Sequence, residues 1–123
     1  MTESPNLKSA TLLLDVVIHA MQEKQAKEIS SLDLRKLPTS PADFFVICHA
    51  DNDRQVEAIA RSVDEETRAK LGERPWHLEG MDNKCWVLMD YVDIVVHIFQ
   101  KEQRKFYNIE GLWADAETTT HED

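Results

Sequence analysis

The sequence predicts an α/β (α+β) protein in which a mixed sheet of about five strands is flanked by helices. Two observations lead to this prediction. Short runs of β-branched and aromatic residues, which favour strands, are separated by Gly, Pro, Asn and Asp. Two longer segments repeat apolar residues every three or four positions, which indicates helices with one buried face. Helices that interrupt a run of strands favour a mixed sheet covered by helices.

The composition is that of an acidic globular protein. The chain has 123 residues, and the hydrophobic share of 42% is enough to build a core. The formal charge of -9, from 23 acidic and 14 basic residues, disfavours direct nucleic-acid recognition and favours a basic protein partner. We assign residues 1–116 to a single domain. We expect residues 117–123 to form an acidic disordered tail, because the last ten residues, ADAETTTHED, are acidic and have no apolar residue other than alanine.

Neither a targeting pattern nor a membrane span is predicted. The first ten residues have no basic segment followed by an apolar one, and no apolar run approaches the roughly 18–20 residues of a span. Cys48 and Cys85 lie in apolar runs and are expected to be buried thiols, not a disulfide. These features predict a cytoplasmic protein.

The first half of the chain is expected to contain two helices and two strands. Residues 6–24 have the apolar spacing of a helix, residues 29–34 a short strand, and residues 44–49 a buried strand. The clearest helix follows, with an N-cap among Asp51, Asn52 and Asp53 and an end at Gly72. Its predicted inner stripe consists of Val56, Ile59, Ala60, Val63 and Thr67.

The second half is expected to contain three strands and a short helical segment. Residues 75–79 are a weak strand candidate, followed by a turn at residues 80–83. Residues 86–99, WVLMDYVDIVVHIF, are dense enough in apolar residues for a buried hairpin, although they include Asp90 and Asp93. Residues 100–113 fit one or two short helices.

The hairpin has two different faces. If the chain reverses at Tyr91–Val92, Asp90 lies opposite Asp93, and side chains alternate between the faces along each strand. One face is then wholly apolar and is expected to be core: Val87, Met89, Ile94, Val96 and Ile98. The other mixes aromatic, aliphatic and charged side chains: Trp86, Leu88, Asp90, Asp93, Val95, His97 and Phe99. Such a mixture is typical of a surface that binds another molecule.

Three functions fit this second face. Asp90 and Asp93 could hold a metal ion in a small nucleotidyltransferase-like enzyme, but the chain has three glycines and no phosphate-binding loop. The face could instead serve only to form a dimer. The third interpretation, a docking surface for a basic protein, agrees best with the acidic composition, and it requires no catalytic residue, metal or cofactor.

Three segments resemble the ribosomal silencing factor family, also called the Iojap-like family. They are ADFFVICHADNDRQVEAIA, WVLMDYVDIVVHIF and RKFYNIEGLWADA, and they occur in the family's order and spacing. The resemblance extends from about the first helix to Ala116. The chain departs from the family pattern in two connections: it has His49–Ala50 in place of Ser-Gly, and Val92 in place of Gly.

The resemblance implies a function without catalysis. Family members bind the large ribosomal subunit through ribosomal protein L-fourteen, block joining of the small subunit and lower translation when nutrients are short. Homodimers are known in the family, and its fold is similar to that of nucleotidyltransferases without their catalytic residues. No direct nucleic-acid recognition, membrane binding or cofactor is implied for this chain.

The expected contact residues lie in and beside the hairpin. We predict that Trp86 and Leu88 are apolar anchors, with Tyr91 beside them. Asp90 and Asp93 are expected to pair with Lys or Arg of the partner. The remaining two predicted partner-binding residues are His97, on the same face, and Glu79, a weaker addition just before the hairpin.

Overall fold

The computed structural model describes the backbone of residues 5–123 and the side chains from residue 11 onward. The helices are α1 (Pro5–Glu23), α2 (Asp53–Leu71), α3 (Lys101–Tyr107) and α4 (Ile109–Leu112). The strands are β1 (Lys27–Asp33), β2 (Phe44–Ala50), β3 (His77–Glu79), β4 (Trp86–Asp90), β5 (Ile94–Gln100) and β6 (Glu117–Thr120).

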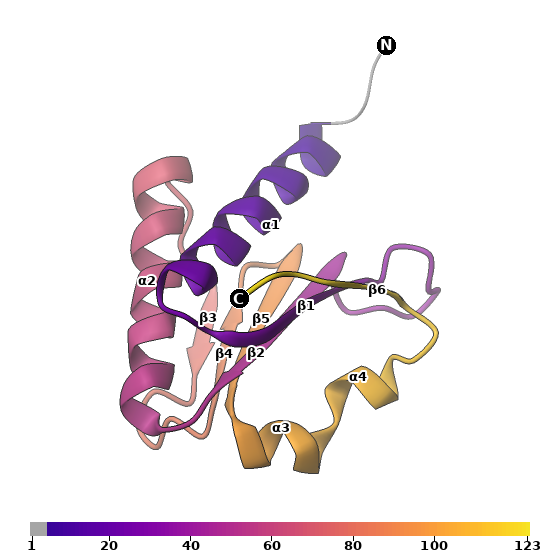
Figure 1. Ribbon diagram of the computed structural model, residues 1–123. Helices are drawn as coiled ribbons and strands as arrows, with labels where there is room; N and C mark the ends of the chain where they lie inside the picture. Colours follow the sequence, from indigo (N-terminus) through magenta and orange to yellow (C-terminus); the bar gives the residue numbers. More distant parts are fainter. Residues whose placement is uncertain (1–4) are drawn as a thin grey trace.

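The six strands form one mixed sheet in the order β3-β4-β5-β2-β1-β6. Its two central strands, β2 and β5, are parallel, whereas the other neighbouring pairs are antiparallel. Helices α1 and α2 cover one face of the sheet, and α3 and α4 lie against the other (Figure 1). The predicted class, a mixed sheet flanked by helices, is confirmed.

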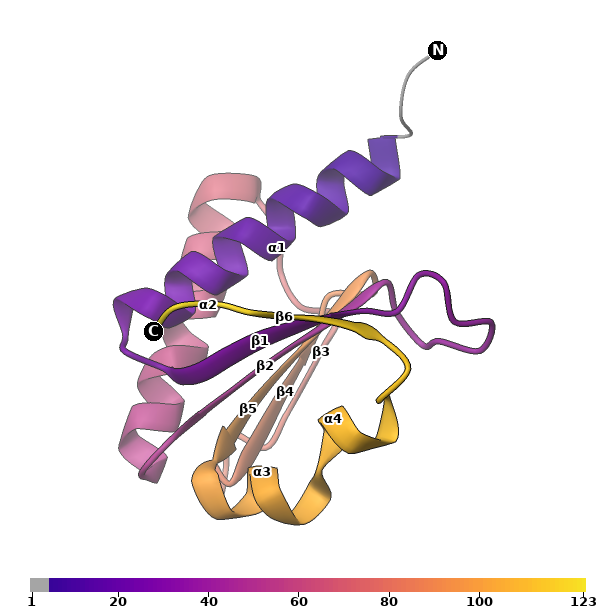
Figure 2. The same ribbon diagram turned by 45° about the vertical axis from the view of Figure 1, so that its right-hand side comes forward.

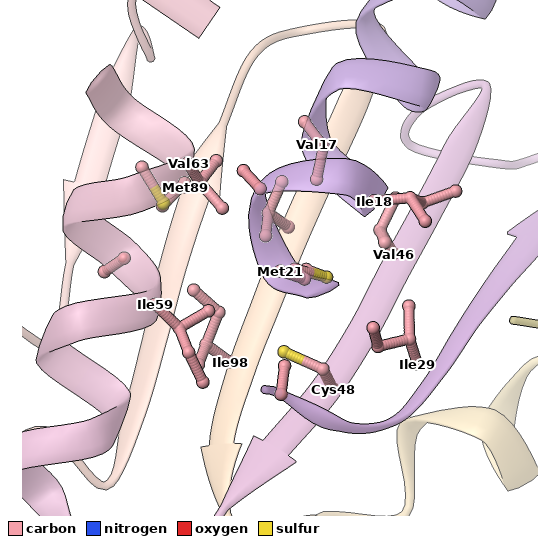
Figure 3. Packing of buried hydrophobic residues seen from close by; sticks show 14 of the residues in the cluster. Val17, Ile18, Met21, Ile29, Val46, Cys48, Ile59, Val63, Met89 and Ile98 are labelled. Atoms are coloured by element: carbon pink, nitrogen blue, oxygen red, sulfur yellow. The ribbon is translucent and has the colours of Figure 1, made fainter. Parts of the chain in front are cut away.

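The larger core lies between the sheet and the α1–α2 layer. Figure 3 shows Val17 and Met21 of α1 and Ile59 and Val63 of α2 pointing toward the buried side chains of the strands. Burying a side chain of this size contributes about 1.5–3 kcal/mol relative to leaving it exposed. The predicted inner stripe of α2 is confirmed, since all five of its residues are buried.

Both ends of α2 agree with the sequence prediction. The Asn52 side chain accepts a hydrogen bond from the Gln55 N–H at 2.9 Å, which satisfies one of the N–H groups left unpaired at a helix start. Gly72 ends the helix with a left-handed backbone, at φ 66°.

A second core lies on the opposite face of the sheet. Leu32, Phe45, Val95 and Phe99 are buried there, and Trp113 packs against them from the segment after α4. The central strands are therefore buried on both sides, which explains why β2 has no exposed position. Trp86 and Leu88 pack at the border of this second core.

The segment predicted as a disordered tail is ordered in the structure. Glu117–Thr120 form β6, which pairs antiparallel with β1 and adds a strand to the expected five. The sequence argument relied on missing apolar residues, but an edge strand can be held by backbone pairing alone, and three consecutive Thr residues favour an extended chain. Among the described residues, no helix is long and apolar enough to cross a membrane.

Candidate protein-docking surface

The turn between β4 and β5 lies one residue later than predicted. Asp90 pairs with Val95, not with Asp93, and the Tyr91 N–H donates to the Ile94 carbonyl at 2.8 Å. The turn residues are therefore Val92 and Asp93, and Val92 takes a left-handed backbone at φ 77°. The predicted reversal at Tyr91–Val92 was wrong because side-chain alternation alone is compatible with either turn position.

The strand residues nevertheless keep their predicted faces, whereas Asp93, predicted on the second face, lies in the turn. The register shift moves each residue by two positions along its partner strand, and side chains two apart share a face. Val87 and Met89 are buried in the larger core, as predicted. Trp86 and Leu88 face the other way and are half-buried at the edge of the second core.

A groove beside the hairpin forms the candidate docking site. The Trp86 ring lines this groove and packs against Phe99, with the ring centroids 5.0 Å apart, and against Tyr107 of α3 at 4.6 Å. The groove is lined by Glu79, Gly80, Asn83, Cys85, Trp86, Leu88, Gln103 and Tyr107. Of these lining residues none carries a positive charge, so the groove combines aromatic surface with one carboxylate.

The acidic residues near the groove have separate roles. Glu79 is exposed, and its carboxylate is hydrogen-bonded to the His77 ring at 2.5 Å. Asp90 is half-buried and accepts a hydrogen bond from the Val92 N–H at 2.8 Å. The Asp93 carbonyl accepts the N–H groups of Asp43 and Phe44, which fastens the turn to the start of β2.

His97 is not a surface residue, which corrects its predicted role. Its side chain is 3% exposed, and its Nδ1 atom accepts the Trp86 indole N–H at 3.1 Å. Burial lowers the pKa of His97 to about 4, so the imidazole is neutral near pH 7. Because Nδ1 is the acceptor, the proton lies on Nε2, which has no hydrogen-bond partner among the described residues. His97 therefore orients Trp86 from below.

Tyr91 also lies away from the groove. It is 5% exposed in the larger core, and its hydroxyl is 2.9 Å from the Thr67 hydroxyl of α2. Burial raises the pKa of the Tyr91 phenol to about 12. The prediction that Tyr91 lies beside the anchors was wrong because Tyr91 continues the alternation of Val87 and Met89 and so faces the helices.

Helices α3 and α4 supply surface that the hairpin argument missed. Tyr107 lines the groove, and Phe106, whose ring lies 5.1 Å from that of Tyr107, is 80% exposed. Leu112 of α4 is also exposed, at 73%. Exposed aromatic side chains of this size are typical of protein-binding surfaces. The residues of the Tyr–Glu–Leu–Trp ending were already visible in the sequence, but no pattern there placed them against Trp86.

The described residues provide no arrangement suited to metal or nucleophilic chemistry. Among them, no group of three or more His, Cys, Asp or Glu side chains could hold a metal ion. Both cysteines are free thiols, and burial raises the pKa of Cys48 to about 12. What the site offers instead is an aromatic groove with acidic neighbours.

Comparisons with known proteins give the chain its relatives. The family model described as "Ribosomal silencing factor during starvation" matches residues 7–123. The ribosomal silencing factor of Bacillus subtilis is 40% identical over 104 residues, which cover 85% of this chain and 86% of that protein. The chloroplastic protein Iojap of Zea mays is 34% identical over 100 residues, which cover 76% of this chain and 42% of that protein.

Two crystal structures share the fold. A protein from Chromobacterium violaceum matches with a TM-score of 0.81 and 33% identity, covering 85% of this chain and 86% of its own. A protein from Bacillus halodurans matches with a TM-score of 0.75 and 34% identity, covering 92% of this chain and 99% of its own.

Proposed function

Because this chain belongs to the ribosomal silencing factor family, we propose that it binds the large ribosomal subunit through ribosomal protein L-fourteen. Bound there, it blocks joining of the small subunit and so represses translation in the cytoplasm when nutrients are limiting. The proposed mechanism is steric, without a catalytic step.

One observation carries this proposal: the aromatic groove lined by Glu79, with Asp90 two residues beyond its lining residue Leu88 on the same face of β4. A ribosomal protein that contacts RNA is basic, and a chain of net charge -9 attracts it. Leu88, Tyr107 and the exposed edge of Trp86 offer apolar contact, and the two acids select basic side chains at the rim. Asp93 and Glu79 remain proposed contacts, whereas His97 is assigned to the support of Trp86 and Tyr91 to the larger core on the opposite face.

The enzyme alternative has less support. It requires Asp90 and Asp93 to share a metal ion, but Asp90 pairs with Val95 and caps the turn with its carboxylate. A melting experiment with nucleotide and Mg²⁺ tests it directly. A rise in melting temperature would favour the enzyme alternative.

Charge reversal at the rim tests the docking proposal. We expect the double variant Glu79→Lys with Asp90→Lys to lose co-sedimentation with large subunits on a sucrose gradient, because two attractive contacts become repulsive. Tyr91→Phe is the matched control: it removes one buried hydroxyl, and its binding should equal that of the unmodified chain. A folded double variant that still co-sediments would show that the partner binds elsewhere.

A homodimer through the same groove is the competing use of this surface. Leu88→Glu separates the two, because Leu88 borders the groove and is less enclosed by aromatic rings than Trp86. We expect this variant to lose at least about tenfold in affinity for large subunits. Gel filtration that shows loss of a dimer, together with unchanged subunit binding, would assign the groove to self-association.

A further inference from the structure

Residues 117–123 connect two layers of the fold along one edge of the sheet. The segment leaves α4 on one face, runs beside β1 as β6, and ends next to α1 on the other face (Figure 2). The pairing places Thr120 opposite Ser30 and Thr118 opposite Leu32. We call residues 117–123 the clasp.

Polar contacts hold the end of the clasp. The His121 N–H donates to the Ile29 carbonyl at 2.8 Å, and the His121 ring is hydrogen-bonded to the Ser31 hydroxyl at 2.8 Å. Gln22 of α1 donates its side-chain N–H to the Glu122 carbonyl at 2.8 Å. The clasp is therefore tied to both α1 and β1.

The clasp contributes no buried apolar side chain. All four residues of β6 are exposed, and the last residue that packs on the second core is Ala116, just before it. An element attached only through hydrogen bonds opens more readily than one that is held in a core. The rest of the sheet can therefore remain folded while the clasp detaches.

Glu28 links the clasp to α3. Its N–H donates to the Asp123 carboxylate at 3.0 Å, and its carbonyl accepts from the Arg104 guanidinium at 2.8 Å. Glu28 has a left-handed backbone at φ 50°, next to an irregularity in the β1–β2 pairing. A non-glycine residue in this conformation persists when its surroundings hold it. Here one of the two hydrogen bonds that hold Glu28 comes from the clasp and the other from α3.

Arg104 in turn fixes the position of α3. Besides Glu28, its guanidinium contacts the His49 ring nitrogen at 2.9 Å and the Glu110 carboxylate at 2.5 Å. The same helix carries Tyr107, which packs on Trp86 in the docking groove. Glu28 is thus connected to the groove through its hydrogen bond to Arg104 and through the packing of Tyr107 of α3 on Trp86.

We propose that the clasp is a releasable device that sets the shape of the docking groove: attached, it holds Glu28 for Arg104 and keeps α3 against the sheet. When it detaches, Glu28 relaxes, α3 loosens, and Tyr107 no longer packs firmly on Trp86. The effect on ribosome binding rests on the proposed function, whereas the effect on α3 does not.

Two proline variants of the full chain test the device. The His121 N–H bonds to β1, so in an antiparallel ladder the Thr119 N–H also points to β1 and the Thr120 N–H points away. Thr119→Pro removes a ladder bond, and Thr120→Pro is the matched control. We expect hydrogen exchange of the α3 and α4 amides to accelerate about tenfold or more in Thr119→Pro and to stay near the wild-type rate in Thr120→Pro.

Closing the clasp covalently gives the opposite test. Ser30 and Thr120 face each other across a pair without direct hydrogen bonds, the geometry in which Cβ atoms lie closest. The variant Ser30→Cys with Thr120→Cys, in a Cys85→Ser background, should exchange its α3 amides more slowly when oxidised than when reduced. Equal exchange in both redox states, or equal exchange in the two proline variants, would overturn the proposal.

Glu28 itself supplies the decisive variant. Glycine adopts a left-handed backbone without strain, so Glu28→Gly should make α3 insensitive to the clasp. Asp123→Ala should then accelerate α3 exchange in the wild-type background and leave it unchanged in Glu28→Gly. An equal effect in both backgrounds would show that the clasp does not act through Glu28.

Binding to large subunits is measured on the same variants. Weaker binding of Thr119→Pro, restored in the oxidised disulfide variant, extends the device to docking. If no variant and no wild-type protein binds large subunits, the proposed function fails, while the exchange rates still decide the clasp.

Discussion

At the scale of single residues, burial separates contact from support on the hairpin. Trp86, Leu88 and His97 share one face, but the α3–α4 layer covers this face only in part. It leaves Trp86 and Leu88 half-exposed and encloses His97 completely. Alternation along the sequence predicts which residues share a face. It cannot predict how far a neighbouring layer extends, because short helices such as α3 have little apolar periodicity of their own.

His97 makes stability depend on pH. Its folded-state pKa of about 4 lies below its ordinary value of 6.5, so the unfolded chain binds the proton more readily between these values. The contribution of neutral His97 to the free energy of unfolding is complete above pH 6.5. It falls as the pH drops toward 4, by at most about 3 kcal/mol. We expect urea unfolding at pH 7 and at pH 4.5 to show this loss of free energy.

The control for this prediction is His97→Asn, which removes the titrating ring. The pKa of His49 is also lowered, by burial and by the neighbouring Arg104, so His49 too loses stabilising free energy as the pH falls. The variant His97→Asn should therefore keep a weaker pH dependence of its unfolding free energy. Carboxyls with lowered pKa values lose their contribution as the pH falls toward and below their ordinary values, which are 3.8 for Asp33 and Asp51. Glu57 and Glu66, with an ordinary value of 4.5, add a loss of the same sign only at the acidic end of this window. An identical pH dependence in His97→Asn would show that another group is responsible.

At the scale of elements, the missed features are those that depend on distant partners. Helix α2 was predicted with its caps and inner stripe because all its signals are local. β6 escaped prediction because β1 supplies its partner groups from 80 or more residues away in the chain. The β4–β5 register was missed by one turn position because Val92 lacks the usual turn chemistry.

The turn at Val92 is strained, and glycine should relieve the strain. A left-handed backbone costs an ordinary residue about 1–2 kcal/mol, and glycine avoids this cost. Glycine loses about 0.5–1 kcal/mol more in chain entropy on folding, so the net gain is smaller than the strain that is relieved. Val92 is 53% exposed, so little buried surface is lost. We expect Val92→Gly to raise the free energy of unfolding by about 1 kcal/mol, measured by chemical denaturation.

Gly72→Ala gives the matched change of opposite sign. Gly72 is left-handed at φ 66°, and a Cβ atom there would meet nothing within 4 Å, so only backbone strain is added. We expect a loss of about 1 kcal/mol. A stabilised Gly72→Ala, or a destabilised Val92→Gly, would show that side-chain contacts outweigh backbone conformation at these positions.

At the scale of the whole molecule, the net charge of -9 and the position of the acids should affect docking differently. Net charge attracts a basic partner from any side, whereas Glu79 beside the groove acts on the docked pair. We expect the association rate with large subunits to fall as the salt concentration rises, because the Debye screening length decreases to about 10 Å at 0.1 M salt. The dissociation rate should change less, since it depends on the apolar contacts of the groove.

Two single charge reversals separate these effects. Glu65→Lys lies on the exposed side of α2, which covers the other face of the sheet, and it changes the net charge by the same amount as Glu79→Lys. Both variants should associate more slowly at low salt, but only Glu79→Lys should also dissociate faster, because it alone places a repulsive charge beside the bound partner. Stopped-flow or surface-binding kinetics at two salt concentrations measure both rates. If Glu65→Lys speeds dissociation as much as Glu79→Lys, the partner does not sit on the groove, and the docking surface must be sought on the α1–α2 side.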